Sequence, residues 1–165
     1  MKKFRSFLFM CLIILGFLVY NSQKATTSIN QQNCRVYFVD RQLHKLVSVP
    51  IASEKNIEKT ADKIISEIIS GRDYNPEILR IVPDIEDGIS VRISGEIAYV
   101  NLSGKLLGKV NISRDTEKLL VYQIVNSLTS IDGVEYVSFA VDGEPRKDFL
   151  GFIDMRGLFT PDYDI

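Results

Sequence analysis

The sequence predicts an α+β domain with the element order ββαββαβ, in which two helices cover one face of a mixed or antiparallel sheet as a two-layer sandwich. Three observations lead to this prediction. Residues 89–103 alternate apolar and polar side chains on both sides of a short turn. Residues 57–68 and 120–128 repeat apolar side chains with the helical period, and residues 136–142 alternate again. Each segment has a single apolar face, so the segments must pack on one another.

The predicted domain starts with two strands. Residues 35–40 are rich in β-branched and aromatic side chains, and residues 46–52 can pair with them across a short loop. Pro50 lacks a backbone N–H, which predicts that the second strand is short or lies at a sheet edge.

The first helix is predicted from a one-sided pattern. Ser53 or Asn56 can cap its start, and Gly71 can adopt the left-handed conformation after its end. Its apolar stripe consists of Ile57, Ala61, Ile64, Ile65 and Ile68. Its polar side consists of Glu58, Lys59, Asp62, Lys63 and Glu67. In the loop that follows, we expect one end of the core to be closed by Leu79, Ile81, Val82 and Pro83.

The hairpin at 89–103 has one face for burial and one for solvent. The turn is predicted at Ser94, Gly95 and Glu96. The buried face comprises Ile89, Val91, Ile93, Ala98, Val100 and Leu102, and the exposed face comprises Ser90, Arg92, Ser94, Tyr99, Asn101 and Ser103. Tyr and Arg are frequent hot-spot residues of interfaces. We therefore take Arg92, Tyr99 and Asn101 as the candidate partner-binding residues.

The second helix is predicted to begin at Ser113, with Asp115 and Glu117 in its first turn near the positive end of the helix dipole. Its apolar stripe consists of Leu120, Val121, Ile124, Val125 and Leu128, and Asp132 with Gly133 is expected to close it. Asn126 is expected to bond to backbone or to point outward, and Gln123 to flank the stripe. The last strand buries Val137, Phe139 and Val141. The aromatic residues that follow predict a strap across the domain: Phe149, Phe152, Phe159 and Tyr163.

The N-terminus resembles a membrane-targeting segment. Lys2, Lys3 and Arg5 precede an apolar run at residues 7–20. We expect residues 1–22 to be a signal peptide or an uncleaved anchor, residues 23–34 a flexible linker, and residues 35–165 the folded domain. The positive-inside rule places the domain outside the cytoplasm. Neither Cys11 nor Cys34 stands where a lipoprotein cysteine is required, so the mode of attachment stays open.

Charge and cysteine content narrow the function classes. All 21 acidic residues follow Cys34, as do 16 of the 20 basic ones, which leaves the part of the chain after Cys34 with a net charge of −5. An acidic domain without a basic run is a poor nucleic-acid binder. Cys34 has no second cysteine in the exported part, so it is either an inert thiol or the site of an intermolecular bridge.

The sequence offers little for catalysis, and we predict no catalytic, cofactor-binding or metal-binding residues. His44 is the only histidine, which removes the usual base for a nucleophile and makes a zinc site improbable. Carboxylates that could perform acid–base chemistry are Asp84, Glu86 and Asp87, and Asp142 with Glu144. Their neighbouring glycine and proline residues favour a turn role instead.

Several segments in a fixed order resemble the GerMN domain family of spore-forming Gram-positive bacteria. They are Ser70-Gly71, LRIVP at 79–83, AYVNLS at 98–103, EKLLVYQIVNSL at 117–128, VEYVSFAVDG at 134–143 and GFIDMRGLFTPD at 151–162. The resemblance covers residues 35–162. It implies a fold similar to the ring-building motifs of secretion and sporulation channels. It also implies an exported protein on the outer face of the cytoplasmic membrane or in the cell envelope, with no established catalytic residues.

Two functional hypotheses follow. The first is a non-enzymatic, membrane-associated module of sporulation or germination that binds envelope or sporulation proteins, itself, or peptidoglycan. The second is a cell-wall hydrolase that uses the carboxylates near Asp84, or a peptidoglycan-binding accessory protein. Neither hypothesis requires a cofactor.

Overall fold

The computed structural model describes residues 33–42, 44–71, 77–83, 85, 87–110 and 113–165. The elements follow in the order β1 (Asn33–Asp40), β2 (Leu46–Ala52), α2 (Ile57–Ser70), β3 (Ile78–Leu79), β4 (Ile89–Ser94), β5 (Ile97–Leu102), α3 (Gly104–Leu107), α4 (Arg114–Leu128) and β6 (Tyr136–Val141). The predicted α+β class and the order of the main elements are confirmed, and the short β3 and α3 are additions. The predicted leader 1–22 and residues 23–32 of the predicted linker lie outside the described residues. None of the helices within the described ranges is long and apolar enough to span a membrane.

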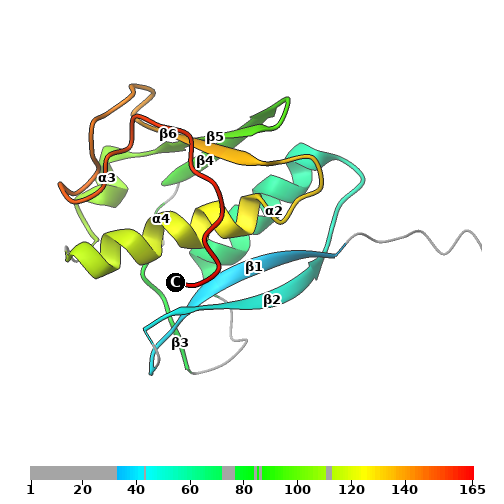
Figure 1. Cartoon of the computed structure of the whole chain (residues 1–165), viewed down its shortest axis with the longest axis horizontal. Helices are drawn as coiled ribbons and strands as arrows, with labels where there is room; N and C mark the ends of the chain where they lie inside the picture. Colours follow the sequence, from blue (N-terminus) through cyan, green and yellow to red (C-terminus); the bar gives the residue numbers. More distant parts are fainter. Residues whose placement is uncertain (1–32, 43, 72–76, 84, 86, 111–112) are drawn as a thin grey trace, which may run out of the picture. The chain divides into compact units, whose positions relative to one another are not determined.

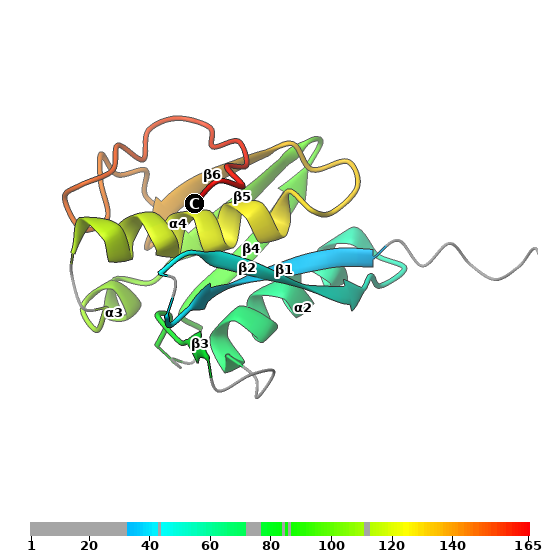
Figure 2. The same cartoon turned by 60° about the horizontal axis from the view of Figure 1, so that its bottom comes forward.

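The strands form two three-stranded sheets in place of the single sheet that the sequence predicts. In the first sheet, β1 pairs antiparallel with β2 on one side and with β3 on the other. In the second, β5 pairs antiparallel with β4 and parallel with β6, which makes this sheet mixed. Helices α2 and α4 lie between the two sheets, as Figures 1 and 2 show. The helices therefore have a sheet on either side.

Burial of α4 explains why β1–β3 form a sheet of their own. One side of α4 carries the predicted stripe, and all five of its residues are buried. The other side packs on β1 and is also buried, although it includes Gln123, Asn126 and Ser127. The Ser127 hydroxyl accepts a hydrogen bond from the Tyr37 amide at 2.8 Å. Because this side of α4 carries polar side chains, hydropathy gives no sign that it is covered.

Helix α2 has the predicted caps. Asn56 accepts a hydrogen bond from the Lys59 amide at 3.0 Å, and Gly71 adopts the left-handed conformation at a φ of 51°. Two details of the predicted pattern are wrong. Ile57 is 38% exposed, because the packing of α2 begins one turn later, at Thr60 and Ala61. Glu67 is predicted on the polar side of the helix, but it is buried at 8% exposure. The remaining stripe of α2 is buried as predicted.

The hairpin and the last strand follow their alternation closely. Gly95 and Glu96 connect β4 to β5, with Ser94 opposite Ile97. Gly95 has a φ of 58°, a conformation that glycine adopts without strain. The side chains predicted to face inward are buried or half-buried, including Val137, Phe139 and Val141 of β6. The face with Arg92 and Tyr99 is turned away from the helices.

The second helix begins and ends near its predicted limits. Ser113 caps α4 by accepting a hydrogen bond from the Thr116 amide at 3.1 Å. The helix ends at Leu128, earlier than the predicted close at Asp132 and Gly133, because residues 129–133 form turns. Helix α3 is not predicted, and its N-cap is Ser103.

The C-terminal segment, residues 143–165, packs on the domain as a strap. Phe149 and Phe159 contact Phe139 edge to face, with ring centroids 5.3 and 5.4 Å apart. Phe152 and Tyr163 are 46% and 60% exposed, so only part of the predicted aromatic strap is buried. Val137 and Phe159 exchange backbone hydrogen bonds of 3.0 and 2.8 Å along the outer edge of β6.

Two buried polar side chains of α4 hold this strap. Glu117 lies in the first turn of α4 as predicted, and it is fully buried there, which is not predicted. Its carboxylate accepts hydrogen bonds from the amides of Leu150 at 3.1 Å and Phe152 at 2.9 Å. The Asn126 side chain donates to the Asp162 carbonyl at 2.6 Å and accepts from the Asp162 amide at 3.0 Å. Asn126 thus bonds to backbone, which is one of its two predicted roles.

Candidate interaction surface

The second sheet leaves one face open because α2 and α4 lie against its other face. Strand alternation turns Arg92 of β4 and Tyr99 of β5 to this open face, and the register places them directly opposite each other. Asn101 lies two residues further along β5, opposite Ser90. The structure therefore gathers all three candidate residues on one surface.

This face is hollowed into a groove of about 700 Å³, which we call the sheet groove. Its floor is formed by strands β4, β5 and β6, and residues of the strap form a wall. Its lining includes Ser90, Arg92, Tyr99, Asn101, Ser138, Ala140, Gly143, Pro145, Met155 and Arg156. The strap thus contributes residues that the strand pattern alone does not identify.

Polar groups in the sheet groove differ in their availability. The Asn101 side-chain oxygen accepts a hydrogen bond from the Gly143 amide at 2.6 Å, which ties the strap to the sheet and leaves the Asn101 amide nitrogen for a ligand. Arg156 donates to Asp154 at 2.9 Å, and these hydrogen bonds lower the pKa of the Asp154 carboxyl. Within the described part of the chain, the side chains of Arg92 and Tyr99 have no hydrogen-bond partner, and Tyr99 is 46% exposed.

The chemistry of the sheet groove is that of binding. A guanidinium, a phenol, an amide and serine hydroxyls can donate hydrogen bonds and pack against a partner. Among the described residues that line the groove, no His, Asp or Glu stands beside a hydroxyl as a base. Elsewhere in the described residues, no three His, Cys, Asp or Glu side chains lie close enough together to hold a metal ion.

Comparison with protein families matches residues 35–147 to Germane, the family of sporulation and spore germination. The chain belongs to the Germane family. A search of curated proteins finds no match. Solved structures share the fold. The first GerMN domain of the sporulation protein GerM from Bacillus subtilis matches with a TM-score of 0.58 at 17% identity, over 80% of this chain and 94% of that domain.

Two further structures extend this comparison. A predicted lipoprotein from Clostridium perfringens matches with a TM-score of 0.57 at 24% identity, over 78% of this chain and 86% of that one. The tandem GerMN domains of Bacillus subtilis GerM match with a TM-score of 0.62 at 16% identity, over 78% of this chain but 45% of the tandem protein. The described part of the chain therefore has the fold of a single GerMN domain.

The carboxylates considered for catalysis serve turns in this Germane domain where they are described. Asp87 and Asp142 have φ angles of 54° and 51°, a left-handed conformation that Asp tolerates in turns. The Asp142 side chain also accepts a hydrogen bond from the Gly104 amide at 3.0 Å, at the start of α3. Asp84 and Glu86 lie outside the described residues.

Neither Cys34 nor His44 lines the sheet groove. Cys34 is buried at 2% exposure, and burial raises the pKa of its thiol, which disfavours the reactive thiolate. These observations favour the inert thiol over the intermolecular bridge. His44 is exposed in the turn between β1 and β2 with a φ of 49°.

Proposed function

We propose that this Germane-family protein is a non-enzymatic interaction module of the spore envelope, exported and held at the membrane surface, that binds a partner through the sheet groove. The single observation behind this proposal is the open sheet face on which Arg92 and Tyr99 stand opposite each other, without a side-chain partner among the residues that the structure describes. Buried polar side chains elsewhere, such as Glu117 and Asn126, bond within the domain. Arg92 and Tyr99 are therefore available to a partner.

Export is supported by the order of basic and apolar residues before the domain. The basic residues at 2, 3 and 5 precede the apolar run 7–20, and the whole acidic part of the chain follows it. A protein of the same fold is a predicted lipoprotein, which is consistent with attachment of such domains to a membrane. The proposed partner is an envelope or sporulation protein, with a second copy of the chain or peptidoglycan as the other outcomes of the tests.

A hydrolase has less support than an interaction module. Of the carboxylates near Asp84, the described Asp87 adopts the left-handed conformation of a turn. Asp142, considered with Glu144 for acid–base chemistry, accepts a hydrogen bond from the start of α3. Acid–base catalysis needs two carboxylates positioned on either side of a substrate. Among the described residues, no such pair faces the sheet groove.

Truncation of the two groove side chains provides the test. In the organism that encodes this chain, a deletion strain is complemented with the parent gene, an Arg92→Ala/Tyr99→Ala variant, or an Arg41→Ala/Tyr163→Ala control. The control removes the same two side-chain types from residues near the first sheet. Because truncation of a hot-spot side chain typically costs about 2 kcal/mol of binding, the double groove variant is expected to lose partner affinity by roughly 100-fold or more.

We expect the parent and the control to restore spore formation and germination, and the groove variant to fail while accumulating to the same level. Full restoration by the groove variant would show that the sheet groove is not the functional surface. Normal spore formation and germination in the deletion strain would contradict the proposed role in sporulation.

A further inference from the structure

The outer edge of β4 carries unused backbone groups. The Ser103 amide donates to the Gly88 carbonyl at 2.9 Å, and this pair is in register with the β4–β5 ladder. Hydrogen-bonded pairs alternate along an antiparallel ladder, so Ser90, Arg92 and Ser94 bond to β5. The backbone groups of Ile89, Val91 and Ile93 therefore point away from β5. Among the described residues, no strand or side chain pairs with them.

The edges of β6, β1 and β2 are protected. The strap bridges β6 at Phe159, and the hydroxyls of Ser127 and Ser130 accept the Tyr37 and Arg35 amides of β1. The outer edge of β2 carries Pro50, and its Leu46 amide donates to the Ile165 carbonyl at 3.0 Å. Such features block the addition of another strand. β4 has no proline, and its only charged residue is Arg92, on the open face.

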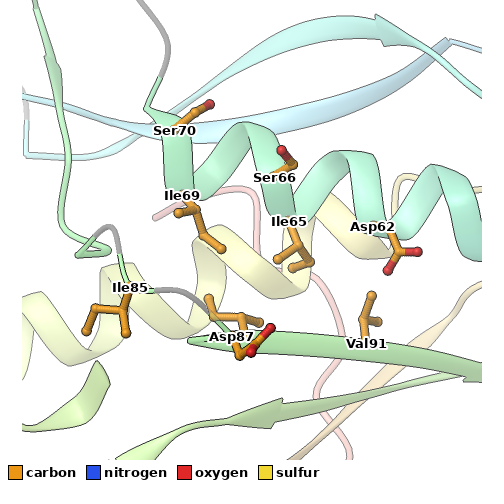
Figure 3. Close-up of a pocket in the computed structure, with 9 residues that line it drawn as sticks. Asp62, Ile65, Ser66, Ile69, Ser70, Ile85, Asp87 and Val91 are labelled. Carbon is orange, nitrogen blue, oxygen red and sulfur yellow. The ribbon is translucent and has the colours of Figure 1, made fainter. Parts of the chain in front are cut away.

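A groove runs beside this edge, between α2 and β4, with a volume of about 400 Å³ (Figure 3). We call it the edge groove. In Figure 3, Ile65 and Ile69 of α2 point toward β4, with Val91 facing them from the strand and Ile85 at one end. A strand added to β4 would place every second side chain over these apolar residues, because side chains alternate along a strand.

The edge groove also has acidic margins. Asp62 of α2 and Asp87 before β4 line it, both are exposed, and neither has an ion-pair partner among the described residues. Carboxylates beside an apolar floor favour an occupant with both apolar and basic side chains. A second copy of β4 does not meet this requirement. Its inward side chains are Ile89, Val91 and Ile93, and pairing would bring two acidic margins together.

We propose that the outer edge of β4 is a strand-addition site for an extended peptide segment of a partner protein, with apolar and basic side chains facing the edge groove. Main-chain hydrogen bonds to Ile89, Val91 and Ile93 provide affinity, and the edge groove selects the inward side chains. This site is distinct from the sheet groove, so it goes beyond the proposed function and does not rest on it.

A synthetic peptide tests the site. The probe is Lys-Thr-Val-Thr-Val-Thr-Lys with blocked ends, which presents Val and Lys on one face and Thr on the other. Its matched control replaces both Lys with Glu. The full chain is held in a mild detergent, and amide hydrogen exchange is followed residue by residue. In the free protein, the amides of Ile89, Val91 and Ile93 are expected to exchange at least about tenfold faster than those of Ser90 and Arg92, since only the latter are hydrogen-bonded.

Saturation with the Lys peptide is expected to slow exchange at Val91 and Ile93 by about tenfold or more. N-methylation of one alternate set of peptide amides should abolish this protection, and methylation of the other set should leave it intact, because only one set faces β4. Protection of the β4 edge in the free protein would overturn the proposal. Equal binding by the two methylated peptides, or no protection by the unmethylated one, would also overturn it.

The acidic margin has its own control. An Asp62→Asn/Asp87→Asn variant should lose the preference for the Lys peptide over the Glu peptide, a preference expected to be roughly three- to tenfold for two exposed ion pairs. An Asp115→Asn/Asp132→Asn variant removes two exposed acids outside the edge groove and should retain the preference. Binding of the Glu peptide as tightly as the Lys peptide to the parent protein would contradict the assigned ligand chemistry.

Discussion

Replacement of Glu117 by Ala is expected to lower the free energy of unfolding by about 3 kcal/mol, because hydrogen bonds to a charged acceptor contribute roughly 1.5–3 kcal/mol each. The side chain is fully buried and accepts the amides of Leu150 and Phe152. Without it, both amides lose their acceptor in a partly buried setting. We expect the strap near Leu150 to open locally, in addition to the global loss of stability.

Urea unfolding and amide exchange measure this effect. Glu117→Gln should give an intermediate loss, since one oxygen acceptor remains. Asp115→Ala is the matched control, because Asp115 is exposed in the same helical turn. If Glu117→Ala loses no more stability than Asp115→Ala, and the amides of Leu150 and Phe152 keep their protection, the carboxylate does not hold the strap.

Replacement of Ile124 by Ala is expected to lower the free energy of unfolding by about 3–4 kcal/mol, within the usual range for truncation of a buried isoleucine. Ile124 is completely buried in the middle of α4, which lies between the two sheets. Neighbouring elements on both sides limit collapse around the cavity that the substitution leaves. The loss should therefore lie in the upper part of the range for such substitutions.

Ile57→Ala provides the comparison for this prediction. Ile57 is 38% exposed at the start of α2, so its truncation is expected to cost less than about 1 kcal/mol. Chemical denaturation of both variants gives the difference. Equal losses for Ile124→Ala and Ile57→Ala would contradict the placement of α4 at the centre of the domain.

The sequence predicts the elements well because their signals are local. Asn56 and Ser113 cap the two main helices as expected, and alternation assigns the two faces of the β4–β5 hairpin. The same alternation brings Arg92, Tyr99 and Asn101 to one surface. Neither capping nor alternation depends on distant parts of the chain, so both can be read from the sequence.

The arrangement of the sheets could not be predicted in the same way. β1 and β2 form a sheet separate from β4–β6, because α4 also buries the side that carries Asn126 and Ser127, whose polar groups bond to backbone. Hydropathy assigns such residues to solvent. For Glu117 a signal exists, because it lies three and four residues before Leu120 and Val121 and therefore on the apolar stripe. Its strap partners are more than thirty residues away.

The polar residues of the motif at 117–128 have a structural role. Glu117, Asn126 and Ser127 are buried and bonded within the domain, so this motif maintains the fold. The sheet groove depends on that role. Its wall includes Met155 and Arg156 of the strap. Glu117 bonds to the strap before these two residues, and Asn126 bonds to it after them. Substitutions in α4 are therefore expected to alter the groove indirectly.

Photo-cross-linking from the sheet groove tests the central claim most directly. A benzophenone amino acid is introduced in place of Tyr99, or in place of Tyr163 as an exposed control on the strap, and cells are irradiated during sporulation and germination. The account predicts a discrete covalent adduct with an envelope component from position 99 and none from position 163. No adduct from position 99, or the same adducts from both positions, would contradict the assignment of the sheet groove as the binding surface.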